Sequence, residues 1–388
     1  YLNDSWGNLT GTKPGSGYYF GSTDGSSKDP YYPGAYENVI GNPDVTWEVA
    51  RKSNAGIDAN FLSDRLSLTA DLFMEKRNNI LWNLGTVPGI VAADLPPANI
   101  GRMTNKGYEL SLRWSDDIGG VFNYSVTANV SYAENRIDYM DEPAYPYPWM
   151  NTTGFSYGQY KGYKTGGFYN SAAEASNRPY VSRDGNKVQA GDIRYIDIDG
   201  DGVIDANDQV PIGWSNLPRY SFSSNIDLEY KGIALSLLFT GSYKGSMPMT
   251  SFYIQNPFYM NNGAAMEFQY DGRWTEEKAA AGIMPTFPRA SMRTYDSQNG
   301  AMNDLWVRST QFIRLKNAEL SYTVGLSDKI RRYGVSSLRI FLNGNNLCTW
   351  GSKLPDGFDP EQEDANGASM GYLYPPTRTF SMGVNLIF

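Results

Sequence analysis

The sequence predicts an all-β protein whose strands belong to an antiparallel transmembrane β-barrel. The first observation is a period of two: from Tyr220 to Tyr230, apolar and polar residues alternate almost without exception. The second is that short and long connections alternate along the chain. The third is composition: charged residues are only 19% of the 388 residues, while there are 29 tyrosines and 40 glycines. The mean hydropathy of −0.47 agrees with this, because barrel strands average out to polar.

About ten strands are expected from this alternation. They are residues 45–60, 66–81, 105–115, 121–133, 157–168, 218–230, 232–244, 305–322, 335–347 and 377–388. The pattern is weakest at 157–168, which is either a strand of the wall or part of one long loop from 134 to 217. Helical spacing is convincing only from Trp274 to Ala281, where Thr275 is placed to cap a helix.

The connections between the strands favour a barrel over a soluble sandwich. An up-and-down barrel places its short turns at one rim and its long loops at the other, whereas a sandwich has no reason to sort its loops in this way. The long connections are residues 82–104, 169–217, 245–304 and 348–376. We expect residues 1–44 to be an extracellular loop leading into the barrel, and residues 45–388 to belong to the barrel. Aromatic residues near strand ends, such as Tyr132 and Tyr243, fit interfacial girdles next to outer-membrane lipid.

Composition also excludes several classes of protein. The chain has no histidine and one cysteine, Cys348, so Ser-His and Cys-His catalysis, imidazole metal sites and internal disulfides are excluded. The net charge of −8 argues against nucleic acid as a partner. Paired carboxylates could still hydrolyse glycosides, but we expect no enzyme. The longest apolar runs are far shorter than the roughly 18 residues of a transmembrane helix.

One acidic segment has the spacing of a calcium-binding loop. Between residues 197 and 208, carboxylates occupy positions 1, 3, 5, 9 and 12, with glycine at position 6. We predict a structural Ca²⁺ site that rigidifies the surrounding loop. Its predicted ligands are Asp197, Asp199, Asp201, the carbonyl of Val203, Asp205 and Asp208. The alternative is a solvated acidic turn without a cation, and another divalent ion is also compatible with the spacing.

A second segment is rich in aromatic residues. It contains Tyr145, Tyr147, Trp149, Phe155 and Tyr157. Such rings can stack on sugars or contact peptides, so they are candidates for ligand contact; the alternative is packing within a large loop at the rim.

Several motifs together resemble the SusC/RagA-type TonB-dependent outer-membrane transporters. The segments that carry this resemblance, in the order of that family, are residues 42–48, 54–66, 99–110, 191–195 with 212–213, 312–317, 338–347, 357–361 and 374–380. Each segment is weak evidence alone, but the series covers nearly the whole chain after about residue 40.

The resemblance implies a barrel of roughly 22 strands with a plug inside. It also implies a SusD-like lipoprotein lid, TonB as the energy source, and oligosaccharide or peptide cargo. The plug, the TonB box and the first half of the barrel are expected to precede Tyr1, so the resemblance implies that residues 45–388 form the C-terminal part of the barrel. Phe380 and Phe388, on the final strand, resemble the signal read by the outer-membrane assembly machinery, and pairing of this strand would remove an exposed edge.

A second interpretation, which assigns the chain to another class of protein, stays open on the sequence alone. It is a calcium-dependent, β-rich secreted adhesin or glycan-binding protein built of β-sandwiches. The leading prediction remains an active importer of nutrients in the outer membrane.

Overall fold

The computed structural model describes most of the chain after residue 41. The described residues are 18–19, 31–32, 42–86, 95–178, 180–181, 188–250, 252–255, 265–291, 298–327, 332, 334–361, 374 and 376–388. The predicted loop 1–44 therefore lies largely outside them; within it, β1 (Tyr18–Tyr19) pairs with β2 (Tyr31–Tyr32). Among the described residues, no helix is long and apolar enough to cross a membrane.

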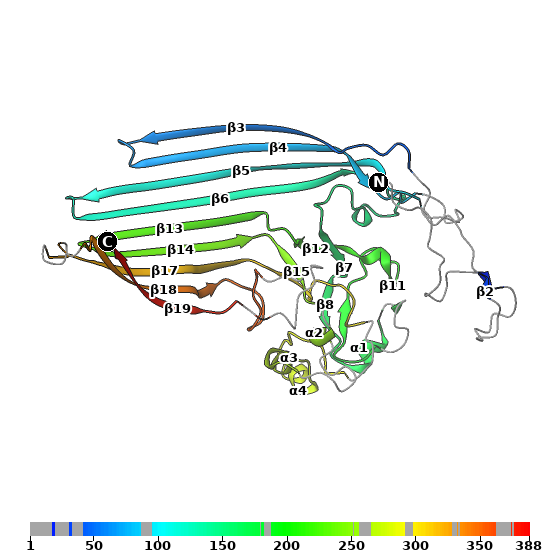
Figure 1. The fold of residues 1–388 in the computed structure, drawn as a ribbon. Coiled ribbons are helices and arrows are strands. Elements are labelled where there is room, and N and C mark those ends of the chain that lie inside the picture. The colour runs from blue at the N-terminus through cyan, green and yellow to red at the C-terminus, as the bar shows by residue number, and fades with distance from the viewer. Residues whose placement is uncertain are drawn as a thin grey trace.

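Nine long strands form one sheet in which every neighbouring pair is antiparallel (Figure 1). The strands are β3 (Val49–Phe61), β4 (Leu66–Trp82), β5 (Ala98–Ile118), β6 (Phe122–Tyr139), β13 (Tyr220–Tyr230), β14 (Ile233–Tyr243), β17 (Phe312–Val324), β18 (Ser337–Trp350) and β19 (Thr379–Ile387). The spatial order follows the chain order from β3 to β19, as in an up-and-down barrel wall. The sheet is open, with β3 and β19 at its two edges.

The segment 157–168 is not a strand of the wall. It forms two short strands, β7 (Gln159–Gly162) and β8 (Thr165–Phe168), which pair with β12 (Val210–Ser215) and β10 (Ile193–Tyr195). The loop reading of 134–217 is therefore confirmed in outline, although β6 itself continues to Tyr139. Prolines and glycines in this region break the strict alternation that the wall strands keep.

The alternation produces two chemically different faces of the sheet. On β13, Ile226 lies between Val126 of β6 and Leu237 of β14 in one cross-strand row. The neighbouring Asp227 lies between Ser125 and Ser236 in the next row, on the opposite face. We call these the outer, apolar face and the inner, polar face. Large apolar side chains on the outer face are well exposed, with 63% of Leu72 and 82% of Met382 accessible.

Short turns and long loops lie at opposite ends of the sheet, which confirms the prediction from their alternation (Figure 1). At the turn end, the chain reverses through left-handed residues, including Leu62, Ser63 and Asp64 in one turn and Gly119 and Gly120 in the next. At the loop end, the connections build a separate body beside the sheet.

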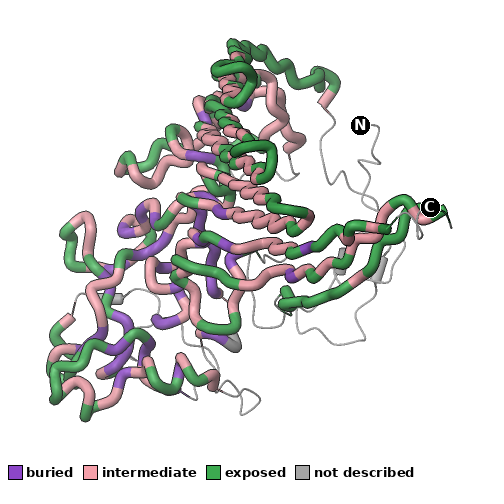
Figure 2. Tube along the Cα trace, turned by 90° about the vertical axis from the view of Figure 1, so that its left-hand side faces the viewer, coloured by how far each residue is buried: buried purple, intermediate pink, exposed green. Residues whose placement is uncertain are grey.

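The loop body has a hydrophobic core of its own. Buried residues gather there, whereas the sheet is mainly intermediate or exposed (Figure 2). Trp306, Tyr163 and Ile193 are almost fully buried within this core. Its elements include the four short strands named above and η1 (Pro148–Met150), α1 (Ala172–Ser176), β9 (Tyr180–Val181), β11 (Val203–Ile204), η2 (Ala206–Asp208), β15 (Ser246–Pro248), α2 (Phe252–Gln255), α3 (Glu267–Gly272), α4 (Glu276–Ala280) and β16 (Val307–Ser309). Helix α4 is the predicted one: Thr275 caps it by accepting from the Lys278 amide.

Two aromatic rows bound the apolar belt of the outer face. Near the loop end, four tyrosines lie directly opposite one another on neighbouring strands; they are Tyr108, Tyr132, Tyr220 and Tyr243. The rings of Tyr108 and Tyr132 stack with centroids 5.4 Å apart. At the turn end, Phe122 and Tyr230 face each other. The ten steps along the strand from Phe122 to Tyr132 span roughly 34 Å, or about 26 Å of membrane depth at a tilt of roughly 40°. This matches a hydrocarbon band.

Candidate functional site

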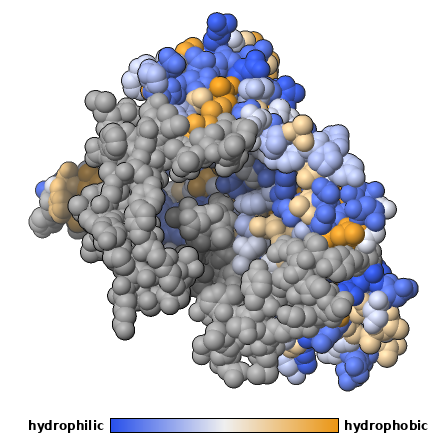
Figure 3. All heavy atoms as spheres, turned by 90° about the vertical axis from the view of Figure 1, so that its right-hand side faces the viewer, coloured by the Kyte–Doolittle hydropathy of each residue, from blue (hydrophilic) through white to orange (hydrophobic). Residues whose placement is uncertain are grey.

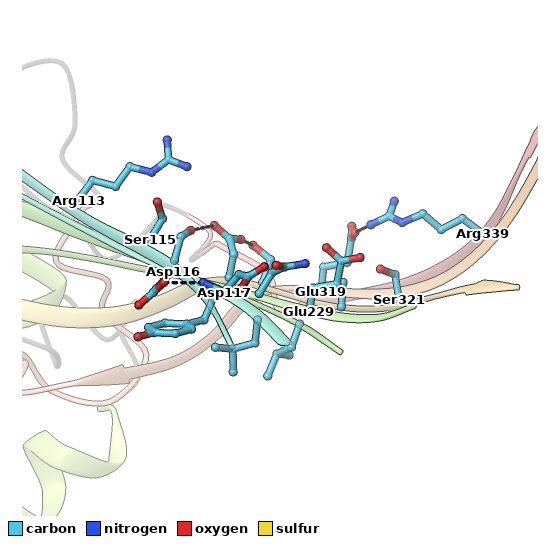
Figure 4. Close-up of a pocket in the computed structure, with 16 residues that line it drawn as sticks. Arg113, Ser115, Asp116, Asp117, Glu229, Glu319, Ser321 and Arg339 are labelled. Atoms are coloured by element: carbon cyan, nitrogen blue, oxygen red, sulfur yellow. Dashed lines mark hydrogen bonds and ion pairs between the residues drawn. The ribbon is translucent and has the colours of Figure 1, made fainter. Parts of the chain in front are cut away.

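The inner face carries a polar hollow of about 550 Å³ near the turn end. Asp227 is central: it accepts from the hydroxyls of Ser125 (3.3 Å) and Ser236 (2.7 Å), each from a neighbouring strand. On the far side of the hollow, Arg339 of β18 pairs with Glu319 of β17 (Figure 4). The alternation of the strands places all these groups on one face. The surface offers many hydrogen-bonding groups of both charges.

Farther from the turns, asparagines continue this polar surface. Asn317 donates to Asn345 (2.8 Å), and Asn345 donates to Asn343 (3.1 Å). These side chains come from β17 and β18, whose residues at these positions face one another. Such a surface suits contact with polar solutes or with another polar protein surface.

The structure brings three of the predicted metal ligands together. Ligand atoms of Asp197, Asp199 and Asp208 lie within 4.8 Å of one another, and Asp208 is fully buried. Burial raises the pKa of Asp208, although its carboxylate accepts from the amides of Ile198 and Asp205. The loop turns through Gly200 and Gly202, both with positive φ, and Ile204 is buried as an anchor.

The other predicted ligands lie outside this group of three. Asp205 caps η2, with its carboxylate accepting from Asn207 at 2.7 Å. Asp201 accepts from the amide of Val203 at 2.7 Å. The amide groups of Gly200 and Gly202 are bound by Asp197. These turn hydrogen bonds shape the loop around the three converging carboxylates, and Asp197 takes part in both groups.

The aromatic segment packs against the acidic loop. The rings of Tyr147 and Trp149 stack in parallel, with centroids 4.6 Å apart. Trp149 donates from its indole nitrogen to the carbonyl of Asn207 (2.8 Å). Tyr147 hydrogen-bonds to Asp199, which raises the pKa of its phenol. The two segments that the sequence presented separately therefore form one unit.

The remaining aromatic candidates are more dispersed. Tyr145 and Tyr157 are exposed, by 39% and 52%. Phe155 is half-buried, with the ammonium of Lys161 at 5.9 Å from its ring. The two exposed rings are free to contact a ligand, whereas Trp149 also packs on the small core formed by Val210, Ile212 and Val307.

An ion-pair cluster that the sequence did not single out as a site fastens the β18–β19 loop to the sheet. Arg314 of β17 is only 1% exposed and forms ion pairs with both Asp359 and Glu361. It also donates to the hydroxyl of Thr349 (2.9 Å). The sequence signal for this cluster lay in the motifs 312–317 and 357–361, which supply the arginine and the two carboxylates.

A second buried cluster holds the loop body together. Asp192 is fully buried and pairs with Arg289 at 2.7 Å. It also accepts a hydrogen bond from the side-chain amide of Asn299 at 3.0 Å. The preceding Gly191 has a φ of 83°, and a Cβ there would lie 2.5 Å from the Trp274 ring. The motif at 191–195 thus has a structural role.

The two predicted assembly-signal aromatics lie on the last strand and beyond it. Phe380 is 75% exposed on β19, and Phe388 is 79% exposed after its end. Within the described residues, β19 pairs only with β18.

The loop end of the sheet, with the described loop segments around it, is mostly hydrophilic with scattered apolar patches (Figure 3).

Comparison with known proteins agrees with this architecture. The chain is 28% identical over 365 residues to TonB-dependent receptor P26 of Formosa agariphila, covering 89% of this chain and 35% of that protein. It is 22% identical over 377 residues to TonB-dependent receptor SusC of Bacteroides thetaiotaomicron, covering 93% and 34%. The chain therefore spans about a third of the length of these curated relatives.

Solved structures share the fold. The structure of the RagAB peptide transporter superposes with a TM-score of 0.69 at 21% identity, covering 96% of this chain and 38% of that one. The RagAB peptide importer in its open-open state gives a TM-score of 0.65. The family model described as TonB dependent receptor-like, beta-barrel, matches residues 5–347. With its single antiparallel wall, apolar outside and polar inside, the chain belongs to the TonB-dependent receptor β-barrel family.

Proposed function

We propose that this chain is the C-terminal part of the wall of an outer-membrane importer of oligosaccharides or oligopeptides. The observation that supports it most is the contrast between the two faces of one continuous sheet in a member of this receptor family. The outer face suits lipid, while the inner face offers hydroxyl, amide and charged groups to a polar solute or a plug. No chemical transformation of the cargo is part of the proposal.

The remaining strands, the plug and the TonB contact would come from the rest of a longer protein. A SusD-like lipoprotein would close the loop end as a lid, as the relationship to SusC and RagAB suggests. The secreted β-sandwich adhesin is disfavoured, because in the described residues no second sheet packs on the apolar outer face.

Uptake by whole cells tests this function. Cells with and without the intact protein would be given labelled oligosaccharides and labelled oligopeptides, each with and without a protonophore that removes the energy source of TonB. We expect uptake of at least one class to depend on both the protein and the proton gradient. Equal uptake by the two strains across both classes would refute the proposal.

We also propose that the acidic loop binds Ca²⁺ and so rigidifies the loop body. The residues fit a hard cation: three carboxylates converge, and a carboxylate oxygen that accepts one amide keeps a further lone pair for a cation. Asp197, Asp199 and Asp208 would be the principal ligands. Asp201, Asp205 and the Val203 carbonyl would complete the shell, directly or through water.

Terbium luminescence offers a direct test, because Tyr147 and Trp149 lie against the loop and would transfer energy to a bound lanthanide. We expect Tb³⁺ emission that Ca²⁺ displaces and that Asp199→Asn weakens strongly. Glu276→Gln, an acid of the same body outside the acidic loop, is the matched control and should leave emission unchanged. Emission that Ca²⁺ does not displace, or that Asp199→Asn does not weaken, would exclude the site.

A further inference from the structure

Above the tyrosine row, the outer face of β3–β6 changes from apolar to basic. One cross-strand row there consists of Arg51, Lys76, Thr104 and Arg136, which lie directly opposite one another on the four strands. Arg51 and Lys76 are therefore like charges in a direct pair, an arrangement that costs stability unless an anion lies between them. The next row toward the tyrosines adds Lys106, opposite Met74 and Glu134.

The carboxylates on this face are already engaged. Glu134 pairs with Arg219 at 2.8 Å, and Asp138 pairs with Arg136 at 2.8 Å. Within the described residues, none of Arg51, Lys76 and Lys106 has a carboxylate within 4.0 Å. We call these three residues the basic rim.

The carboxylates nearest in sequence point to the other side of the sheet. Glu75 pairs with Lys52 at 3.4 Å and with Arg77 at 2.8 Å, on the inner face. Because Lys52 follows Arg51 and Arg77 follows Lys76, two of the three outward cations have an inward, paired neighbour. The basic rim is thus left with three positive charges on the outer face.

The basic rim lies where lipid headgroups meet the wall. Lys106 is two residues beyond Tyr108 on β5, and the row of Lys76 is four residues beyond it. With strand rise and tilt taken into account, these positions lie roughly 5 Å and 10 Å above the tyrosine row. Lys76 and Lys106 also line a hollow of about 750 Å³ on this face.

We propose that the basic rim binds the phosphate-bearing headgroup of an anionic lipid in the outer leaflet. Lys76 and Lys106 would hold the phosphate within the hollow, and Arg51 would neutralise it from β3. The tyrosine row below would receive the start of the acyl region. This inference rests on the membrane orientation in the proposed function, but not on import or on any cargo.

Lipid retention by the intact protein tests the proposal. Native mass spectrometry from detergent would be titrated with bis-phosphorylated lipid A and, separately, with its dephosphorylated form. We expect the phosphorylated lipid to be retained at least tenfold more strongly. Lys76→Gln or Lys106→Gln should weaken retention about fivefold, and the double variant about 25-fold. Lys76→Arg should preserve it.

The adjacent inward residues provide matched controls. Lys52→Gln and Arg77→Gln remove the same charge from the same strands on the other face, so retention should not change. Heat-modifiable mobility would show that each variant is folded. Equal retention by the double variant, equal retention of both lipid forms, or displacement of the lipid by equimolar inorganic phosphate would each overturn the proposal. Uptake of cargo is measured separately, so a failed import function leaves this result interpretable.

Discussion

A charge placed on the outer face should disrupt the protein far more than the same charge on the inner face. Val126 lies on the outer face of β6, between Trp114 of β5 and Ile226 of β13. It is four residues from Phe122 at the turn end, which is roughly 13 Å along the strand and about 10 Å in depth. This position is close to the middle of a band of about 25 Å.

Arginine at Val126 would therefore carry nearly the full midplane penalty of about 2–4 kcal/mol. That corresponds to a loss of roughly 30-fold to 1,000-fold in the folding equilibrium. Asn129 is the control position: it lies on the inner face between Ser111 and Ser223, where its amide donates to Ser223 at 3.1 Å. Asn129→Arg places the charge among polar groups, and we expect a change below about 1 kcal/mol.

Both variants would be unfolded in vesicles with urea, and outer-membrane levels would be compared in cells by heat-modifiable mobility. The reasoning requires a large loss for Val126→Arg and little change for Asn129→Arg. A similar loss for the two variants would refute the assignment of the faces, because it would mean that both sides of β6 are buried alike.

Three further predictions follow from other parts of the chain. Replacing Arg314 by Met leaves Asp359 and Glu361 without their buried partner. We expect the free energy of unfolding to fall by about 3–5 kcal/mol and residues 351–361 to be cleaved faster by a protease. The control Lys316→Met removes an exposed partner of Glu361 and should cost below about 1 kcal/mol. Deleting Phe388, or changing it to Asp, should prevent insertion into the outer membrane, and normal surface levels of that variant would contradict its role as an assembly signal. Burial raises the pKa of Glu142, but hydrogen bonds from Thr153 and Thr152 outweigh this and hold the pKa below its usual 4.5. The turn at 142–153 should therefore be stable above pH 4.5 and loosen as the pH falls below it. The loosening should appear as lost protection against hydrogen exchange, relative to the intrinsic rate at each pH, and Glu142→Gln should show this loss at every pH.

The wall was predictable because each of its strands obeys one local rule. Alternation identified the strand predicted at 218–230 to within two residues at its start, and it identified 66–81 and 232–244 to within one residue at each end. It underestimated β5, which begins at Ala98, because the residues from Asn99 to Lys106 do not alternate between apolar and polar beyond the membrane band. The rule depends on contact with lipid, and it weakens where the strand leaves the membrane.

The loop body was not predictable in the same way. Its core joins residues far apart in sequence, as in the contact of Trp306 with Phe287 and the bond from Tyr195 to the carbonyl of Gln298. No hydrophobic periodicity in the sequence identifies these core residues, since each short strand or single turn supplies only one or two of them. The acidic loop was the exception, because its ligands are set by spacing within twelve residues; its contact with Trp149 is nonlocal, and only the fold reveals it.

The strand ends also fix the depth of the sheet in the membrane. At the turn end, β6 begins at Phe122, β13 ends at Tyr230 and β14 begins at Ile233, so the strands stop at the aromatic row itself. At the other end, β5 continues ten residues beyond Tyr108 to Ala98, and the outer face becomes basic there. A wall that ends at one aromatic row and extends past the other cannot shift in depth without placing the basic rim in hydrocarbon or exposing the apolar belt to water. The same two-residue period thus specifies the fold, the two faces and the depth of the wall, because the chemistry of the outer residues changes with depth while the inner residues stay mainly polar.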